Sequence, residues 1–435
     1  MLAALHNNDI QGFSLAKNHY DYKNGLAQLD DHSVTKHRVL VEYLIKYFEQ
    51  RTLKARGREK FKITLVDGFC GAGKYELKSS GDVVLGSPLH MIKAVEAAQI
   101  KVNQGRTKSL VFDVQYLFVD KDPRAVSHLR EVLKEQGYEE LIDKSIHVMC
   151  SAFGSKIDEI LKRIKLHTPR VSTALFLLDQ YGYAEVPAPL IRKIFDELVN
   201  AEIVLTFHVS SFATYTNSEL IDKVSKTLQV DILSRLGGKS IEQIKANDAD
   251  WRRFIQGALY DALVRGCGAR YFTPFFIRGA GSGHGEYWLV HLSQHHRAQD
   301  VMKQVHWQNH NHFVHYGGAG LDMLAPQTMG FMQEFDGGFK FDDVAQTKSD
   351  NELFEQLGQR LSGNVLPQTI AELYSGTCNT SPSTNSMYKN VLEKLVAEKR
   401  VVIHSHDGKA RNHARYMSDN DVIEVSPQIK LFLPP

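Results

Sequence analysis

Apolar runs that alternate with helix-like segments fill the first two thirds of the chain. Five runs rich in β-branched and aromatic residues predict buried strands, and they are FKITLVD, VQYLFVDKD, SIHVMC, STALFLLDQYGY and AEIVLTFHVSS. Segments with helical spacing, such as PRAVSHLREVLKEQ and PAPLIRKIFDELV, lie between them. Strands that are apolar throughout and alternate with helices predict a doubly wound α/β domain, in which helices cover both faces of a parallel sheet.

Two later segments depart from this alternation. Residues 216–268 look mainly helical and predict a helical insertion. The segment ARYFTPFFIRGAGSGHGEYWLVHLSQH has two β-rich runs around a glycine-rich turn, which predicts a hairpin. An antiparallel pair at the end of a parallel sheet is typical of methyltransferase-like folds, so we predict such a domain over residues 61–315.

The segments on either side of this domain have patterns of their own. Residues 1–60 predict a helical extension, because apolar side chains recur at helical spacing after Ser33. Residues 316–350 are rich in glycine and polar residues and predict a linker. Residues 351–435 contain two helical segments and then a hairpin pattern that turns at Asp407–Gly408. Helix, turn, helix and hairpin form the outline of a winged-helix domain.

Composition and charge restrict the functional classes. The 435 residues are 43% hydrophobic and 23% charged, which is ordinary for a soluble globular protein. The net charge of +2 does not draw the whole surface toward nucleic acid or membrane, so any basic surface must be local.

The four cysteines are scattered without a C-x-x-C pair, which argues against a metal cluster or a disulfide framework. The histidines of HLSQHHRAQDVM lack nearby carboxylates or thiols in a ligand pattern, so no metal site is predicted. The chain shows no signal-peptide pattern and no apolar run of about 20 residues, so we expect a cytoplasmic protein that does not bind membranes.

The stretch LVDGFCGAGKYE, from Leu65 to Glu76, fits two ligand-binding patterns. Gly68 to Lys74 matches the phosphate loop G-x-x-x-x-G-K, but Tyr75 stands where that loop needs a Ser or Thr to coordinate Mg²⁺. A phosphate loop also opens directly into a helix, whereas KYELKSSGDVVLGSP separates these glycines from the next helix-like segment. The same residues match D-x-F-x-G-x-G, the turn that holds S-adenosylmethionine in many methyltransferases. A glycine-rich turn after a strand can also bind nothing.

The S-adenosylmethionine interpretation explains more of these residues. Asp67 ends the first strand and can accept a hydrogen bond near the amino-acid moiety of the donor. Asp120 ends the second strand, where an acidic side chain can accept hydrogen bonds from both ribose hydroxyls. Glycines let the backbone turn sharply and approach the ligand closely. We therefore prefer S-adenosylmethionine as the cofactor, and the candidate binding residues are Asp67, Gly68, Phe69, Gly71, Gly73, Ser87, Asp120 and Lys121.

The end of the fourth strand, Asp179-Gln180-Tyr181-Gly182, stands where amino-methyltransferases carry D-P-P-Y. In that motif the acidic or amide side chain and a backbone carbonyl accept hydrogen bonds from the target amino group, and the aromatic ring stacks on a base. Gln180 and Tyr181 replace the two prolines, so the rigid placement of the carbonyl is lost. Asp179 and Tyr181 are the candidate catalytic residues. Alternatively, Asp179 caps the strand and its tyrosine neighbours fill the surface.

Several segments together resemble a known family. HSVTKHRVLVEYL with His32 and Lys36, DGFCGAG, LGSPLHMIKA, LLDQYGY and EYWLVHLSQHHRAQDVMKQVHW resemble, in this order, the three-Cys-motif partner proteins. The resemblance covers residues 31–345 and implies a class I methyltransferase-like fold with the N-terminal helix over the pocket. The implied donor site consists of Asp67, Gly71, Gly73 and Asp120, with Ser87 and Pro88 bracing the next helix. It also implies a partner of the radical-type iron–sulfur class. The chain departs from the family's usual D-P-x-G at Gln180.

The winged-helix segment carries nine Lys/Arg and nine Asp/Glu residues, so it lacks the overall basic charge of a DNA-binding module. Basic residues gather locally in the predicted wing and the second helix, where phosphate contacts are reasonable. The candidate nucleic-acid contacts are Lys389, Lys409, Arg411 and Arg415. The alternative is a winged helix that mediates protein contacts.

These features predict an S-adenosylmethionine-dependent methyltransferase that acts on nucleic acid, with DNA preferred, in concert with an iron–sulfur partner protein. The main alternative is a non-catalytic sensor or adaptor, which uses the pocket for a ligand and the winged helix for DNA or a partner. The missing prolines at the fourth strand favour this alternative somewhat.

Overall fold

The described residues of the computed structural model are 25–29, 31–53, 59–180, 185–208, 239–246, 254, 266–277, 287–309, 313–315, 319–321, 323, 339–363 and 366–426. Tyr181 and most of the predicted insertion at 216–268 therefore lie outside the described residues. Within these ranges, every helix is too short or too polar to cross a bilayer.

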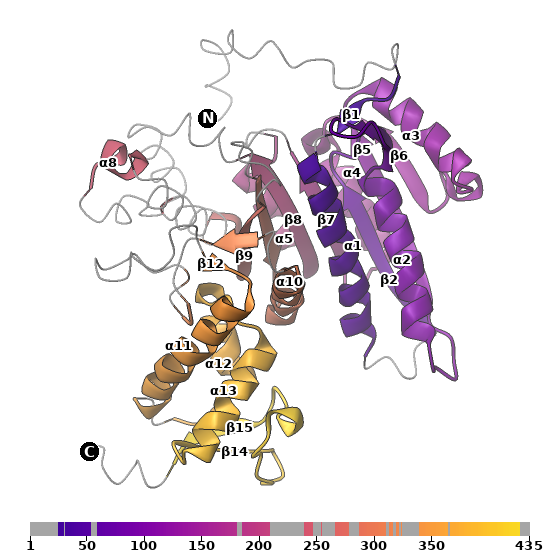
Figure 1. Cartoon of the computed structure of the whole chain (residues 1–435). Helices are drawn as coiled ribbons and strands as arrows, with labels where there is room; N and C mark the ends of the chain where they lie inside the picture. The colour runs from indigo at the N-terminus through magenta and orange to yellow at the C-terminus, as the bar shows by residue number, and fades with distance from the viewer. Residues whose placement is uncertain are drawn as a thin grey trace.

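A nine-stranded sheet forms the centre of the described α/β domain (Figure 1). Its strands, in spatial order, are β12 (Phe339–Lys340), β11 (Phe313–His315), β9 (Tyr271–Ile277), β10 (Tyr287–Ser293), β8 (Asn200–His208), β7 (Thr173–Asp179), β2 (Lys60–Asp67), β5 (Val111–Asp120) and β6 (Ile146–Cys150). The strands from β8 to β6 are parallel, and β10 lies antiparallel between β8 and β9. The predicted methyltransferase-like fold, a parallel sheet that ends in an antiparallel hairpin, is confirmed.

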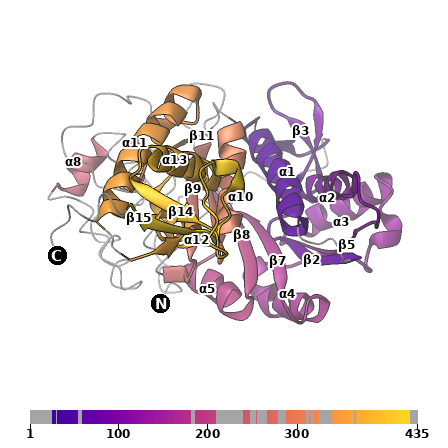
Figure 2. The ribbon, with the colours of Figure 1, turned by 90° about the horizontal axis from the view of Figure 1, so that it is seen from below.

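Helices cover both faces of this sheet (Figure 2). One face is covered by α1 (Asp31–Thr52), α2 (Ser87–Asn103), α3 (Pro123–Glu135) and α10 (His296–Gln308), and the other by α4 (Phe153–His167) and α5 (Ala188–Glu197). Side chains alternate between the two faces of a strand, so Leu65 packs in the first of these cores and Val66 in the second. Both faces of β2 are therefore removed from water, which explains why its sequence is apolar almost throughout.

A small three-stranded sheet separates the glycine turn from α2. It consists of β1 (Gln28–Leu29), β3 (Lys74–Leu77) and β4 (Val83–Leu85), with β1 parallel to β3. The residue before β3 and the residue after β4 are joined by a hydrogen bond, in which the Gly86 N–H donates to the Gly73 carbonyl at 2.8 Å. The chain thus leaves the glycine turn as a strand, whereas a phosphate loop would continue as a helix.

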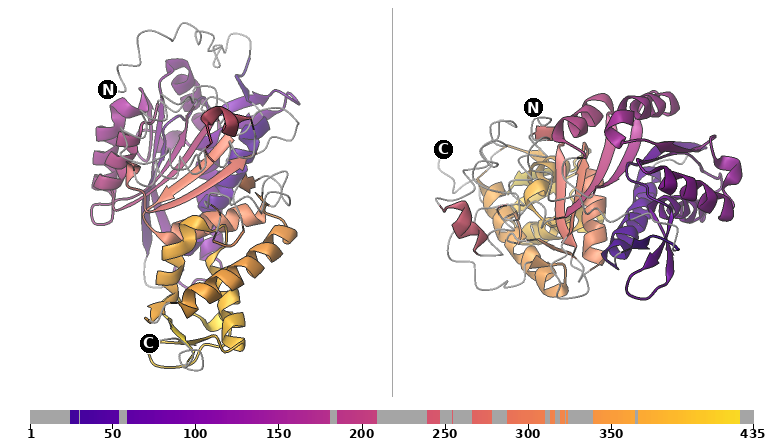
Figure 3. Two further views of the ribbon diagram at one scale, coloured as in Figure 1. Left: turned by 90° about the vertical axis from the view of Figure 1, so that its left-hand side faces the viewer. Right: turned by 90° about the horizontal axis from the view of Figure 1, so that it is seen from above.

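The C-terminal part is a winged helix, which lies at one end of the α/β domain (Figure 3). Its elements are α11 (Asp343–Ser362), β13 (Gln368–Thr369), α12 (Ile370–Thr377), α13 (Asn385–Ala397), β14 (Val401–His404) and β15 (Val422–Val425), and its sheet has the order β13-β15-β14. The fully buried rings of Tyr374 and Tyr388 meet edge to face in its core, with centroids 5.0 Å apart. Helix α11 begins within the segment 316–350 and continues past residue 350.

The wing differs from the simple hairpin that the sequence pattern predicts. The chain does turn at Asp407–Gly408, where Gly408 has a φ of 77° and its N–H donates to the Ser405 carbonyl at 2.8 Å. The residues directly after the turn pair only briefly with the end of β14, where the Arg411 N–H donates to the Ile403 carbonyl at 2.8 Å and the Ser405 N–H donates to the Lys409 carbonyl at 2.9 Å. The longer strand that returns along β14 is β15. A 3₁₀ helix at Ala414–Tyr416 intervenes, and the carboxylate of Glu393 holds it by accepting from the Ala414 N–H at 2.6 Å.

Candidate ligand-binding site

The turn after β2 has a backbone that requires glycine. Gly71 and Gly73 have φ angles of 59° and 80°, which lie in the left-handed region that side chains disfavour. The Gly71 N–H donates to Oδ2 of Asp120 at 3.0 Å, and the Ala72 N–H donates to the Tyr75 hydroxyl at 2.8 Å. The turn is therefore held in a fixed shape by side chains from β3 and from the end of β5.

Asp67 is a fully buried carboxylate at the end of β2. It accepts hydrogen bonds from the Ser87 hydroxyl at 2.6 Å and from the Phe69 N–H at 3.1 Å. Burial raises its pKa to about 7, although these two hydrogen bonds oppose the rise. Burying a carboxylate this far from water costs stability. Such costly groups cluster at functional sites, which makes Asp67 a functional candidate.

Asp120 lies at the end of β5, next to β2, and it is also buried. Its Oδ2 accepts from Gly71 and its Oδ1 from the Asp122 N–H at 2.8 Å, so the carboxylate faces the glycine turn. Burial raises its pKa above the ordinary value. The structure thus brings together the two acids that the sequence places at the ends of neighbouring strands.

The other residues of the predicted cofactor set have mixed surroundings. A Cβ at Gly68 would lie 2.7 Å from Cδ2 of Leu178, so this glycine is needed for close internal packing. Phe69 packs near the ring of Phe153, with centroids 6.2 Å apart. The ammonium of Lys121 forms an ion pair with Glu185 at 2.9 Å on the surface.

The end of β7 carries an ion pair that crosses to the N-terminal helix. Nζ of Lys36 lies 2.6 Å from Oδ2 of Asp179, and the Thr206 hydroxyl donates to Oδ1 of the same carboxylate. The Lys36 side chain is 9% exposed and that of Asp179 is 31% exposed. Burial, the largest single cause, would raise the pKa of Asp179, but the Lys36 ammonium and the Thr206 hydroxyl together outweigh it and the net direction is downward. Asp179 is therefore held as a carboxylate.

Gln180, which replaces a proline of the D-P-P-Y pattern, has a structural role. Its side chain is buried, and its Oε1 accepts from the Val186 N–H at 2.9 Å. The amide thereby fixes the chain on both sides of residues 181–184, which include the candidate Tyr181 and lie outside the described part.

A narrow pocket lies between α1 and the carboxyl ends of β7 and β8. Its cavity volume is about 20 Å³, which is room for about one water molecule, and its polar lining consists of Lys36, His37, Tyr43, Ser87, Asp179 and Thr206. Burial, together with the neighbouring His90 and Lys36, lowers the pKa of His37 to about 3, so this imidazole is neutral. The sequence interpretation missed His37, Tyr43 and Thr206. The position of Thr206 near the end of the fifth strand was the signal that could have identified it.

We expect the Lys36–Asp179 pair to stabilise the fold more than an exposed pair does. Lys36→Met leaves a half-buried carboxylate without its cation, and should lower the free energy of unfolding by about 2 kcal/mol. The matched control is Lys62→Met, because Lys62 pairs with Asp113 at 3.2 Å on the surface; its loss should cost less than about 1 kcal/mol. Urea unfolding of both variants measures the difference, and equal losses would contradict a special role for Lys36.

The four predicted nucleic-acid contacts lie in the winged helix, and three of them pair with acids of the same domain. Lys389 of α13 pairs with Asp419 at 3.0 Å, Lys409 with Asp407 at 2.8 Å, and Arg411 with Asp421 at 3.2 Å. The guanidinium of Arg415 lies over the ring of Tyr416, 4.6 Å from its centroid. The local positive charge is thus largely balanced, in line with the neutral count of the segment.

The chain has distant neighbours among solved structures and a match to one family model. No curated protein matches the chain. Among solved structures, a Legionella pneumophila protein aligns at 12% identity and a TM-score of 0.35, covering 60% of this chain and 85% of its own. An rRNA methylase from Streptococcus thermophilus aligns at 10% identity and a TM-score of 0.28, covering 60% and 94%. A SAM-dependent methyltransferase from Aquifex aeolicus aligns at 11% identity and a TM-score of 0.21, covering 59% and 97%. Scores this low support no functional argument. Residues 324–408 match the family model of the GMT-like wHTH domain.

Proposed function

We propose that this protein is an S-adenosylmethionine-dependent methyltransferase that acts on nucleic acid. The observation that carries the proposal is the pair of buried carboxylates, Asp67 and Asp120, on either side of the left-handed turn at Gly71. Both side chains have raised pKa values because of burial, and both lie at the carboxyl ends of parallel strands, where α/β folds bind their ligands. Such an arrangement favours a cationic, hydroxyl-bearing ligand.

The same residues disfavour a nucleoside triphosphate. Two buried acids repel phosphate oxygens, and the side chain that a phosphate loop directs at its ligand is occupied elsewhere. The ammonium of Lys74 pairs with Glu135 on α3 at 2.7 Å. The chain also leaves the turn as the strand β3, whereas a phosphate loop opens directly into the helix whose N-terminus holds the phosphate group.

Asp67 and Asp120 would hold the two ends of the donor. The carboxylate of Asp67 would accept from the ammonium of the methionine moiety, while Ser87 keeps this carboxylate in place. A carboxylate can accept about four hydrogen bonds, so Asp120 retains sites for the ribose hydroxyls in addition to its bonds to Gly71 and Asp122. When bound, the donor supplies an electrophilic methyl group on a sulfonium.

Asp179 would orient the acceptor. Lys36 keeps this side chain ionised, so it remains an acceptor for an N–H of the substrate but is a weak base. An amino group whose lone pair is aimed at the methyl group needs orientation more than proton removal, because the proton can leave after the transfer. A base within a duplex must first be flipped out of the stack. The resemblance to the three-Cys-motif partner proteins adds an iron–sulfur protein as the proposed partner.

Calorimetry with S-adenosylmethionine tests the site. We expect binding to the parent chain and a loss of at least tenfold in affinity for Asp120→Asn, since the amide cannot accept on both of its atoms. Asp113→Asn is the matched control, because Asp113 lies on the same strand but at the opposite end. If the parent chain does not bind the donor, the proposal fails.

A labelled-methyl assay on DNA and RNA then separates the enzyme from the second candidate, a non-catalytic adaptor. The structural use of Gln180 favours the adaptor, because the D-P-P-Y carbonyl geometry is replaced by a buried amide contact. Transfer that is abolished by Asp179→Ala would support the enzyme. Donor binding without transfer to either nucleic acid would support the adaptor.

A further inference from the structure

The recognition helix of the winged helix is turned toward its own protein. A helix-turn-helix module reads duplex DNA by placing its second helix in the major groove, where residues of its first turn contact base edges. Here that helix is α13, and the residues leading into it, Ser381, Ser383 and Thr384, are buried. The turn that leads into the recognition helix is therefore removed from solvent, and within the first turn of the helix Met387 and Tyr388 are also buried, whereas Ser386 is exposed.

Helix α10 of the α/β domain covers this turn. Oδ1 of Asp300 accepts from the Asn385 N–H at 2.7 Å, the indole N–H of Trp307 donates to the Pro382 carbonyl at 3.0 Å, and Nζ of Lys303 lies 3.4 Å from the Ser383 carbonyl. The buried Lys303 ammonium also donates to the Cys378 carbonyl at 2.7 Å. These bonds use backbone groups of the turn itself, so the contact depends on the helix being docked in this orientation.

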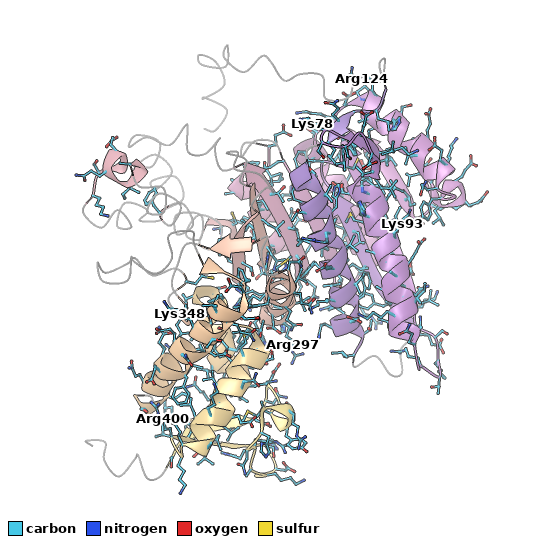
Figure 4. The ribbon with its side chains drawn as sticks, in the orientation of Figure 1. Lys78, Lys93, Arg124, Arg297, Lys348 and Arg400 are labelled. Carbon is cyan, nitrogen blue, oxygen red and sulfur yellow. The ribbon has the colours of Figure 1, made fainter. Side chains whose placement is uncertain are left out.

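The first basic residue of α13 belongs to the same contact. Lys389 pairs with Asp419, which also pairs with Arg297 of α10 at 3.2 Å. Figure 4 shows Arg297 where α10 meets the winged helix, whereas Arg400 lies at the other end of this domain. A phosphate would have to break this three-residue network in order to reach Lys389.

The wing, by contrast, is exposed and held in a fixed shape. Arg411 is tied to the buried Asp421, and Glu393 accepts from His413 at 3.1 Å as well as from the Ala414 N–H. The Lys409 side chain is 73% exposed, and its pairing with Asp407 is a surface ion pair of little energy. Arg415 is also exposed. Two cations therefore remain accessible to a phosphate backbone.

We propose that this winged helix is docked inward through its recognition turn and contacts nucleic acid through the wing alone, by means of Lys409 and Arg415. Such contacts reach phosphates and read no bases, so binding is independent of sequence. This inference rests on the proposed function in that the acceptor is nucleic acid.

Fluorescence anisotropy with the full chain and two unrelated DNA duplexes of equal length tests the proposal at several salt concentrations. We expect equal affinity for the two sequences. Lys409→Ala and Arg415→Ala should each reduce the slope of log affinity against log salt by about 1. Ser386→Glu is the matched control, since it changes the net charge by the same amount at an exposed position in the first turn of α13. It should leave affinity and slope unchanged.

Three results would overturn the inference: a preference between the sequences, a loss of affinity in Ser386→Glu as large as in the wing variants, or no binding of DNA by the parent chain. Calorimetry with S-adenosylmethionine on the same variants keeps this failure distinct from that of the proposed function. The wing variants should bind the donor as the parent chain does.

Discussion

Asp67→Asn should abolish S-adenosylmethionine binding and at the same time stabilise the unliganded chain at alkaline pH. The loss of binding follows because a neutral amide cannot pair with the ammonium of the donor. The gain in stability follows from burial, which raises the pKa of Asp67 from 3.8 to about 7. Between these values the folded state binds a proton that the unfolded state has released, so stability falls as pH rises, by at most about 1.4 kcal/mol per pH unit. Above pH 7 the folded state bears the full cost of burying the ionised Asp67 carboxylate.

Urea unfolding at pH 5 and pH 8 measures this effect. The free energy of unfolding of the asparagine variant should not decrease between pH 5 and pH 8. At pH 8 it should exceed that of the parent chain by about 2 kcal/mol, after allowance for a weakened hydrogen bond. Asp122→Ala is the control of opposite sign, because the hydrogen bond from Arg124 lowers the pKa of Asp122 and this side chain caps α3. It should lose about 1 kcal/mol. An asparagine variant that is less stable than the parent at pH 8 and still binds the donor would show that Asp67 is structural.

Gly73→Ala should lower the free energy of unfolding of the α/β domain by about 3 kcal/mol, because it combines backbone strain with overpacking. Gly73 has a φ of 80°, and an added Cβ would lie 2.6 Å from Cδ1 of the buried Leu129 and 3.2 Å from Cδ2 of Leu89. Relief of this overlap requires the buried side chain of Leu129 to repack beside the glycine turn, so donor affinity should fall as well.

Gly105→Ala separates the two causes. Gly105 has a similar φ of 73°, but no atom lies within 4 Å of its added Cβ. In this control only the backbone strain acts, so the free energy of unfolding should fall by about 1 kcal/mol. Thermal unfolding and urea unfolding of both variants provide the comparison, and equal losses would mean that packing against α3 contributes nothing.

The sheet could be predicted because burial on both faces leaves an unmistakable pattern. The strand β7, for example, reads TALFLLD, and its apolar residues are buried on both faces of the sheet. The small sheet could not be predicted, because β4 has only three residues and its first residue, Val83, is exposed. The start of α11 was missed within a glycine-rich segment, although Asp342 carries a usable signal: its side chain caps the helix by accepting from the Ala345 N–H at 2.9 Å.

The candidate site was predictable where its residues end strands, form the glycine turn or, like Ser87, begin a helix. Asp67 and Asp120 follow from strand boundaries, since the carboxyl ends of parallel strands share one edge of the sheet. The pairing of Lys36 with Asp179 spans 143 positions in the sequence and depends on how α1 packs across the sheet, which no local pattern encodes. The docking of α13 against α10 has the same origin. Its bonds go to backbone atoms of residues 382–385, which carry no sequence signature.

Helix α10 contributes both to the pocket beside α1 and to the contact with the winged helix. Its Met302 lines the pocket, and the adjacent Lys303 is sealed against the winged helix with its charge directed at two carbonyls. A shortened chain that ends before residue 343 would expose the apolar surroundings of this ammonium. Gln299 would lose the Cys378 carbonyl as an acceptor, and Asp300 would lose the Asn385 N–H as a donor. The α/β domain is therefore expected to be less stable without the winged helix than with it.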